Sequence, residues 1–269
     1  MSIALAMIAA HVPHICHEEK APDFQRPLID SMKRIGQDMQ AMGIDVVVIA
    51  SSHWMSTFKH YVDGTPVHKG ILTAHECPDS ISNVHYNYPG DEQLAGQLAN
   101  AGEGIGLPVV AINDPTYILD YGTVVPLRYL VPKEDIPVVP LSLAWAADLD
   151  ETFRWGQQIG RVLEQSDKRA CFVSTGTLSH NLVRGVESQP SLSEQALNKQ
   201  FVQYLLDGDY ESAKVMLPQF ARIAGVESGG RHLALLLGVM DGGNYKAKYH
   251  AYAQSSASAN YILTFHPEK

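Results

Sequence analysis

The 269-residue sequence contains little cysteine and no long apolar run. Its three cysteines, Cys16, Cys77 and Cys171, lie far apart and form no CxxC pair, which argues against a disulfide framework or a thiolate zinc site and favours a reducing cytosol. No window approaches the roughly 18 uninterrupted apolar residues that a membrane span requires. The apolar N-terminus lacks the basic segment of a signal peptide. We therefore expect a cytoplasmic protein with no membrane partner.

Positive charge is also scarce in this chain. Twenty Lys and Arg face 29 Asp and Glu, for a formal net charge of −9, and the two signs are interspersed. No basic stripe is present that could neutralise nucleic-acid phosphates, so nucleic acid is excluded as a partner. A hydrophobic content of 45% suffices for a sizeable core, which excludes a disordered chain.

Short apolar runs alternate with helical patterns along the chain. Strands are predicted at residues 3–9, 46–51, 109–112, 138–143, 171–174 and 261–265. Helices are predicted at residues 24–42, 91–101, 150–165 (with Asp148 or Asp150 as N-cap), 193–206 and 232–240. This alternation predicts a single α/β domain over residues 1–269, with a mostly parallel or mixed central sheet covered by helices. Residues 59–90 break the rhythm and are predicted to form a hairpin-like excursion near the active site.

What the sequence has in abundance is histidine, at 12 residues. Three predicted strands are followed by histidine: HVPH holds His11 and His14, SSHW holds His53, and STGTLSHN holds His180. Ligands of open α/β sheets bind at the carboxyl ends of the strands, so these imidazoles are expected near one another. Taken singly, a histidine after a strand is more often an ordinary turn residue. The repetition is what indicates a site.

Two imidazoles and one carboxylate are the ligand set of non-haem Fe(II) enzymes. His53 and either His11 or His14 supply the imidazoles. Glu227 is the best-placed carboxylate because glycines flank it in AGVESGG, although spacing alone also allows Glu76 and Glu103. His180 then remains as an acid/base group, a role that suits an imidazole near neutral pH. The same residues would also suit a zinc-dependent hydrolase.

Five motifs in order carry a resemblance to a known family. They are HVPH, DVVVIASSHW, LDYGTVVPLRYL, STGTLSHN and AGVESGG. From about residue 5 to about residue 265 the chain resembles the class III extradiol dioxygenase superfamily, typified by the protocatechuate 4,5-dioxygenase catalytic subunit. YNYPG and LDYGTVVPLRY resemble its 3,4-dihydroxyphenylacetate 2,3-dioxygenase branch.

The resemblance implies a non-haem Fe(II) enzyme that opens an ortho-dihydroxylated (hetero)aromatic ring with O2, inserting both oxygen atoms. It implies His11, His53 and Glu227 as iron ligands and His180 as the catalytic acid/base. Tyr121 occupies a position where many members have histidine, and we expect it to act in catalysis as a phenolic hydrogen-bond donor, with packing against the substrate ring as the alternative. The residues expected to contact substrate are His14, Tyr121, Thr123 and Asn181. A homo-oligomer, as a dimer or a multiple of a dimer, is also implied.

Two alternatives to this function stay open. Memo-like proteins keep the same scaffold without dioxygenase chemistry, and the presence of all four site residues argues against that alternative. A zinc-dependent hydrolase would use the same ligands to activate water. Metal content and oxygen uptake distinguish these functions.

Overall fold

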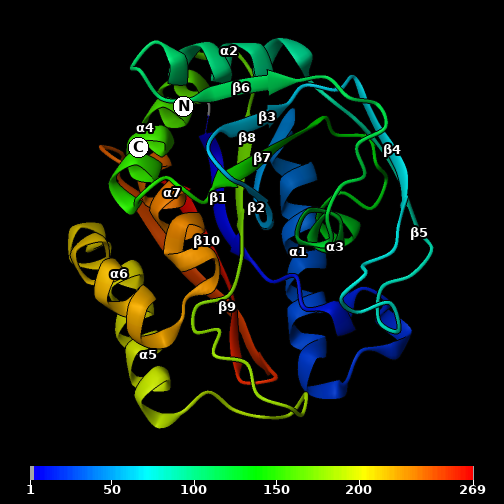
Figure 1. Ribbon diagram of the computed structural model, residues 1–269, viewed down its shortest axis with the longest axis vertical. Coiled ribbons are helices and arrows are strands. Elements are labelled where there is room, and N and C mark those ends of the chain that lie inside the picture. The colour runs from blue at the N-terminus through cyan, green and yellow to red at the C-terminus, as the bar shows by residue number, and fades with distance from the viewer. Residues whose placement is uncertain (1–2, 269) are drawn as a thin grey trace.

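A computed structural model describes residues 3–268, which fold around one large sheet (Figure 1). The sheet has eight strands in the order β6-β3-β7-β2-β8-β1-β10-β9, and β4 and β5 form a separate two-stranded sheet. The strands are β1 (Ile3–Ala9), β2 (Val46–Ser56), β3 (His60–Asp63), β4 (Val67–Leu72), β5 (Val84–Pro89), β6 (Val109–Ile112), β7 (Val138–Ala144), β8 (Ala170–Thr175), β9 (Tyr245–Ser255) and β10 (Ser258–Pro267).

The large sheet is mixed, which confirms the predicted fold class. Four neighbouring strands at its centre are parallel to one another, in the order β7, β2, β8 and β1. Strands β3 and β6 are also parallel to each other. Antiparallel pairing joins β3 to β7, β1 to β10 and β10 to β9. The central strands are buried on both faces, as expected for parallel strands between helix layers.

Helices cover both faces of the sheet. They are α1 (Arg26–Met42), α2 (Glu92–Glu103), α3 (Tyr121–Leu130), α4 (Leu149–Gln165), α5 (Leu192–Leu206), α6 (Tyr210–Ala224) and α7 (Arg231–Val239), and four 3-10 turns are η1 (Pro13–Ile15), η2 (Glu18–Lys20), η3 (Asp23–Gln25) and η4 (Glu227–Gly230). In Figure 1, α1 and α3 lie on one side of the sheet and α4 and α7 on the other. Each face has its own hydrophobic core.

The five predicted helices are present within two residues of their expected ends. Asp148 is the N-cap of α4, and its side chain accepts a hydrogen bond from the Glu151 amide. Two helices, α3 and α6, were not predicted. Each contains an internal proline, Pro126 or Pro218, which is unfavourable in a helix by propensity alone. Burial, almost complete for α3 and of one face for α6, and an aspartate N-cap in each outweigh that cost.

The predicted excursion contains a real hairpin, formed by β4 and β5 at one side of the molecule (Figure 1). The first part of the predicted excursion was wrongly placed outside the large sheet. It forms β3, which pairs with β6 and β7. The prediction also ended β2 at residue 51, whereas the strand continues to Ser56 through a shift in register between Ala50 and Met55. That shift lies at His53.

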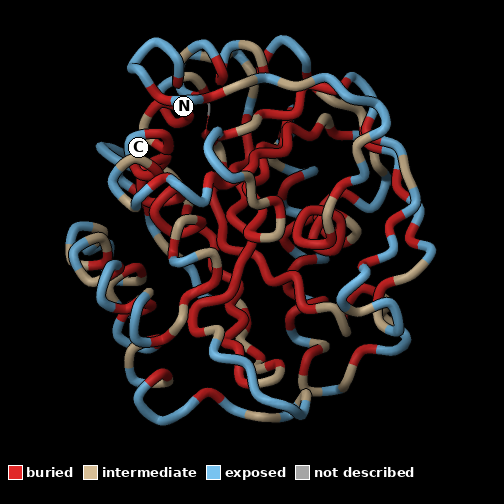
Figure 2. The backbone as a smooth tube through the Cα atoms, viewed as in Figure 1, coloured by how far each residue is buried: buried red, intermediate tan, exposed pale blue. Residues whose placement is uncertain are grey.

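Burial follows this layering. In Figure 2, the central strands and α3 are almost wholly buried, whereas α5, α6 and the hairpin present exposed residues. Within residues 3–268, no helix combines the length and apolarity that a bilayer crossing requires.

Candidate metal centre and adjoining cavity

Three side chains from distant parts of the chain converge at the carboxyl end of the central strands. One nitrogen each of His11 and His53 and one oxygen of Glu227 all lie within 4.8 Å of one another. Glu227 Oε1 is 3.3 Å from His11 Nε2 and 3.0 Å from His53 Nε2. This is the two-histidine, one-carboxylate donor set that binds divalent iron or zinc in other proteins.

The parallel sheet places the two histidines together. His11 follows β1, and His53 lies near the end of β2; both strands pair with β8 in register, Ala6 and Val48 both opposite Phe172. The two imidazole rings meet edge to face, with centroids 4.9 Å apart. The register shift in β2 occurs where the strand passes the site, as bulges often do beside active sites.

Glu227 is brought in by an unusual turn. The residues after it, Ser228, Gly229 and Gly230, have φ values of 50°, 63° and 82°, all in the left-handed region. Only glycine adopts that region without steric cost, which explains the two glycines and implies strain at Ser228. The turn directs the Glu227 side chain inward, where it is 7% exposed.

Two further residues hold this turn in place. The Arg231 guanidinium donates to the carbonyls of Ala147 and Trp145 at 2.8 Å each and to that of Ser228 at 2.9 Å. It therefore ties the turn to the loop after β7. The fully buried His232 has its Nδ1 3.1 Å from the Glu227 carbonyl oxygen. Neither residue was predicted, because their roles depend on contacts with segments far along the chain or on the shape of the turn.

The electrostatics of the site keep Glu227 ionised. Burial alone would raise the pKa of this carboxyl, but the His11 and His53 imidazoles beside it hold the pKa well below its usual value. The other oxygen, Oε2, accepts a hydrogen bond of 2.7 Å from the Thr177 amide. A buried carboxylate that faces two imidazoles and no Lys or Arg among the described residues is a fitting place for a divalent cation.

His180 lies close enough to interact electrostatically with this cluster. It is half-buried and its backbone amide donates to the Ala224 carbonyl at 3.0 Å. Burial lowers the pKa of its imidazole, with Glu227 opposing the shift and His11 and His53 adding to it. The ring is therefore neutral near pH 7 and can accept a proton.

Tyr121, at the start of α3, lies with its ring against both candidate histidine ligands. Its ring centroid is 3.9 Å from that of His53 and 5.7 Å from that of His11. Burial raises its pKa above the usual value, and the negative charges of Glu227 and neighbouring groups raise it further. The phenol therefore keeps its proton and can donate a hydrogen bond.

The Thr123 hydroxyl is engaged elsewhere. It donates to Asp120 Oδ2 at 2.9 Å, and Asp120 Oδ1 accepts from the Thr123 amide and from the Ser51 hydroxyl. Ser51 Oγ also accepts from the His53 amide at 3.1 Å. Asp120 thus caps α3 and links it to the strand that carries His53. The sequence signal for this cap is an aspartate three residues before Thr123.

Asn181 and His14 are the remaining predicted substrate contacts. Asn181 is exposed, and its amide donates to Glu194 at 2.7 Å. His14 is half-buried in η1, and burial lowers the pKa of its imidazole.

A cavity of about 400 Å³ adjoins the cluster. The hairpin and the segment that leads into α3 form its walls, and His53, Glu76, Asp120 and Tyr121 lie on its lining. Neither Thr123, Asn181 nor His14 lines it. Of the three candidate ligands, His53 has the most exposed side chain, at 24%. Of the three candidate ligands, His53 is therefore the one that faces this cavity.

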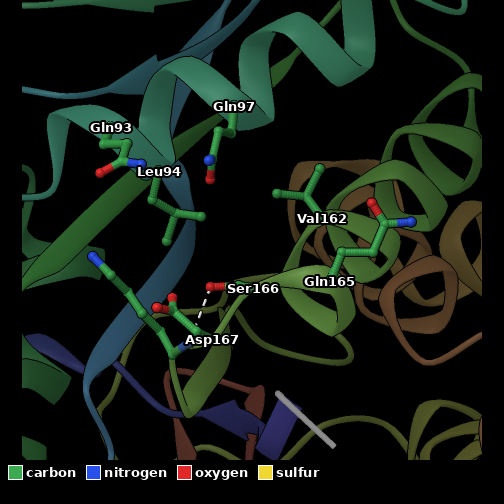
Figure 3. Close-up of a pocket in the computed structure, with 8 residues that line it drawn as sticks. Gln93, Leu94, Gln97, Val162, Gln165, Ser166 and Asp167 are labelled. Carbon is green, nitrogen blue, oxygen red and sulfur yellow. Dashed lines mark hydrogen bonds between the residues drawn. The ribbon is translucent and has the colours of Figure 1, made fainter.

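A second hollow of about 540 Å³ lies between α2 and α4. Figure 3 shows Gln93, Leu94 and Gln97 of α2 opposite Val162 and Gln165 of α4. It also touches Lys168, just before β8 begins, whereas the metal cluster lies past the other end of that strand. The two hollows are thus separated by about 20 Å of strand. The metal cluster, with its adjoining cavity, is the better candidate for chemistry.

The fold and the cluster define an α/β protein with a candidate divalent-metal site at the carboxyl edge of its sheet. Comparison with known families makes this specific. Residues 5–264 match the family model described as the catalytic LigB subunit of aromatic ring-opening dioxygenase. The chain belongs to this family, which confirms the resemblance seen in the sequence motifs.

Several relatives are enzymes that carry ring-cleavage names. The 3,4-dihydroxyphenylacetate 2,3-dioxygenase of Escherichia coli is 26% identical, over 96% of this chain and 98% of the relative. The 2-aminophenol 1,6-dioxygenase beta subunit of Pseudomonas sp is 24% identical, over 97% and 93%. The crystal structure of the uncharacterized protein JW3007 from Escherichia coli K12 superposes with a TM-score of 0.72 at 18% identity, covering 97% of this chain and 99% of that one. It supports the fold alone.

Proposed function

We propose that this protein is a non-haem Fe(II)-dependent extradiol dioxygenase, which opens a catechol-type or related ortho-dihydroxylated (hetero)aromatic ring with O2. The observation that carries the proposal is the convergence of His11, His53 and Glu227 within 4.8 Å, beside a cavity of about 400 Å³. Membership of the ring-opening dioxygenase family supports it. The names of the relatives support both diol and aminophenol rings as substrates.

His11, His53 and Glu227 would hold the metal through two imidazole nitrogens and one carboxylate oxygen. When bound, Fe(II) supplies a Lewis-acidic centre that brings diol and O2 together and allows electron transfer between them. Among the three ligands only Glu227 is anionic, so the metal keeps a positive charge that a singly deprotonated diol can offset.

His180 would act as the acid/base residue. Its neutral imidazole accepts a proton from a diol hydroxyl and returns it when the oxygen–oxygen bond breaks. Tyr121 would donate a hydrogen bond from its protonated phenol toward the bound ligands. Tyr121 therefore takes the place of an imidazole donor. We also propose His14, Thr123 and Asn181 as outer contacts that shape the substrate environment.

The cellular setting is part of the same proposal. The three cysteines are all free thiols, which suits a reducing cytoplasm. A homo-oligomer, as a dimer or a multiple of a dimer, is expected of this enzyme and is measurable by light scattering.

The test is anaerobic loading of the protein with Fe(II), followed by oxygen-electrode assays with catechol, 2-aminophenol and substituted catechols. We expect iron bound at one per chain and oxygen uptake with at least one diol. Zinc binding accompanied by ester or amide hydrolysis, without oxygen uptake, would overturn the proposal in favour of a hydrolase.

A further inference from the structure

The cavity beside His53 offers the ring of a substrate two apolar walls. Ile71 and Leu72 come from β4, and Ile118 and Leu119 from the segment before α3. Ile71 and Ile118 are 52% and 45% exposed, which is unusual for large apolar side chains. Apolar side chains on both sides suit a flat aromatic ring, whose burial against them is favourable.

The polar part of the same lining is acidic. Glu76 and Asp120 both line the cavity, and no Lys or Arg does so among the described residues. Glu76 Oε1 lies 3.9 Å from His53 Nδ1, so its charge is next to a candidate metal ligand. The side chain is 58% exposed and points to no cationic partner other than that imidazole in residues 3–268.

Asp120 adds a second negative charge deeper in the site. Its oxygens accept hydrogen bonds from Ser51 and Thr123, which fix the carboxylate without neutralising it. His75 is the one other lining residue, apart from His53, that can take up a proton to become cationic. The two carboxylates of the lining, Glu76 and Asp120, therefore have no Lys or Arg of the described chain beside them in the cavity to offset their charge.

We infer from this lining that the substrate carries a neutral or cationic ring substituent, and that Glu76 discriminates against rings that bear a carboxylate. The inference rests on the proposed ring-cleavage function and names its substrate class. It separates this protein from the 3,4-dihydroxyphenylacetate 2,3-dioxygenase relative, whose named substrate carries an acid group. Charge complementarity in a partly desolvated pocket changes affinity by about tenfold per charge.

The experiment compares three 4-substituted catechols of similar size with the Fe(II)-loaded protein at pH 7.5. Dopamine is cationic, 4-ethylcatechol is neutral and 3,4-dihydroxyphenylacetate is anionic. We expect kcat/KM for the anion to be at least about tenfold below that for dopamine, with the difference mainly in KM because the charge acts on binding. Equilibrium binding by calorimetry without oxygen should give the same order.

Substitution of Glu76 tests the assignment to this residue. Glu76→Gln should lower the ratio of kcat/KM for dopamine to kcat/KM for 3,4-dihydroxyphenylacetate by about three- to tenfold. Glu76→Lys should make the anionic catechol the preferred substrate. The matched control is Glu103→Gln, the same charge change at an exposed residue outside the cavity. It should leave the ratio unchanged.

Two results would overturn the inference: preferential cleavage of the anionic catechol by the unmodified protein, or a ratio that does not respond to Glu76. Failure of the proposed function looks different, because then none of the three catechols consumes oxygen. In that case the calorimetric binding order still decides the charge inference. Binding that is independent of substituent charge would contradict it.

Discussion

Replacing Glu227 by glutamine should abolish tight metal binding. Glu227 is the only anionic donor in the cluster, and glutamine keeps its size while removing the charge. Changing groups that merely orient metal ligands costs about 10–100-fold in affinity, so loss of this ligand should cost at least about 100-fold.

That loss translates into a measurable difference in thermal stability. At a free metal concentration of about 100 times the Kd, binding stabilises the folded protein by about 2.7 kcal/mol. For chains of this size, this corresponds to a rise in Tm of roughly 5–10 °C. If Glu227→Gln weakens binding by 100-fold, the stabilisation at the same concentration is about 0.4 kcal/mol, or about 1 °C.

The assay is differential scanning calorimetry under argon, with and without Fe(II), and with Zn²⁺ as a redox-inert substitute. Glu103→Gln serves as the control, because spacing alone also allowed this residue as the third ligand, whereas Glu227 is the carboxylate that lies in the cluster. The control should keep the metal-induced rise in Tm. A full rise in Glu227→Gln would refute the assignment and move the third ligand elsewhere.

Three further outcomes are expected. His180→Gln should lower turnover by about 10²–10⁴-fold, as for loss of a general acid/base, while the metal-induced rise in Tm remains; normal turnover would remove His180 from the mechanism. Arg231→Gln loses three hydrogen bonds to carbonyls and should weaken metal binding by about 10–100-fold, and Arg231→Lys should recover only part of that affinity. Unchanged metal affinity, measured by titration, would show that the turn holds Glu227 in place without Arg231. Burial lowers the pKa of the fully buried His60 to about 4. Between pH 6.5 and 4 the unfolded chain therefore binds a proton at this imidazole that the folded chain does not bind. The free energy of unfolding decreases as pH falls through that window. Between pH 7.5 and 5 this amounts to about 2 kcal/mol, and urea unfolding of His60→Gln should lack that part of the decrease.

The elements that local patterns specify were predictable from the sequence. Alternating apolar runs and helical periods predicted the central strands and five helices, because burial on these faces dominates their stability. The helices α3 and α6 were missed since an internal proline hides the helical signal, and only tertiary burial outweighs it. The strand β9 lies at the sheet edge, and it was missed because its first half is mostly exposed or half-buried and only its second half alternates with buried positions.

Part of the candidate site was also predictable from the sequence. His11 and His53 follow from a rule of the fold, since residues at the carboxyl ends of neighbouring parallel strands lie together. Glu227 did not follow from spacing, because its position depends on a left-handed turn that Arg231 ties to a loop 84 residues earlier. No local pattern encodes such a contact. Resemblance to a family selected Glu227 where spacing could not.

The acidic lining of the cavity could not be predicted from the sequence, because it too depends on contacts between segments far apart in the chain. Glu76 lies within the segment 59–90, whose hairpin register and approach to α3 determine which side chains face His53. A shift of one residue in a hairpin turns each side chain to the opposite face. The charge of the lining therefore follows from how the folded hairpin and the segment before α3 come together.

The central claim is that this chain cleaves an aromatic ring with O2 at an iron held by His11, His53 and Glu227. The most direct measurement is a reaction of the Fe(II)-loaded protein with a catechol under ¹⁸O2, followed by mass spectrometry of the product. The account predicts one O2 consumed per ring opened and both ¹⁸O atoms in the ring-opened product, with no reaction in Glu227→Gln. An iron-loaded protein that leaves every catechol intact, or a product with neither oxygen atom from O2, would contradict it.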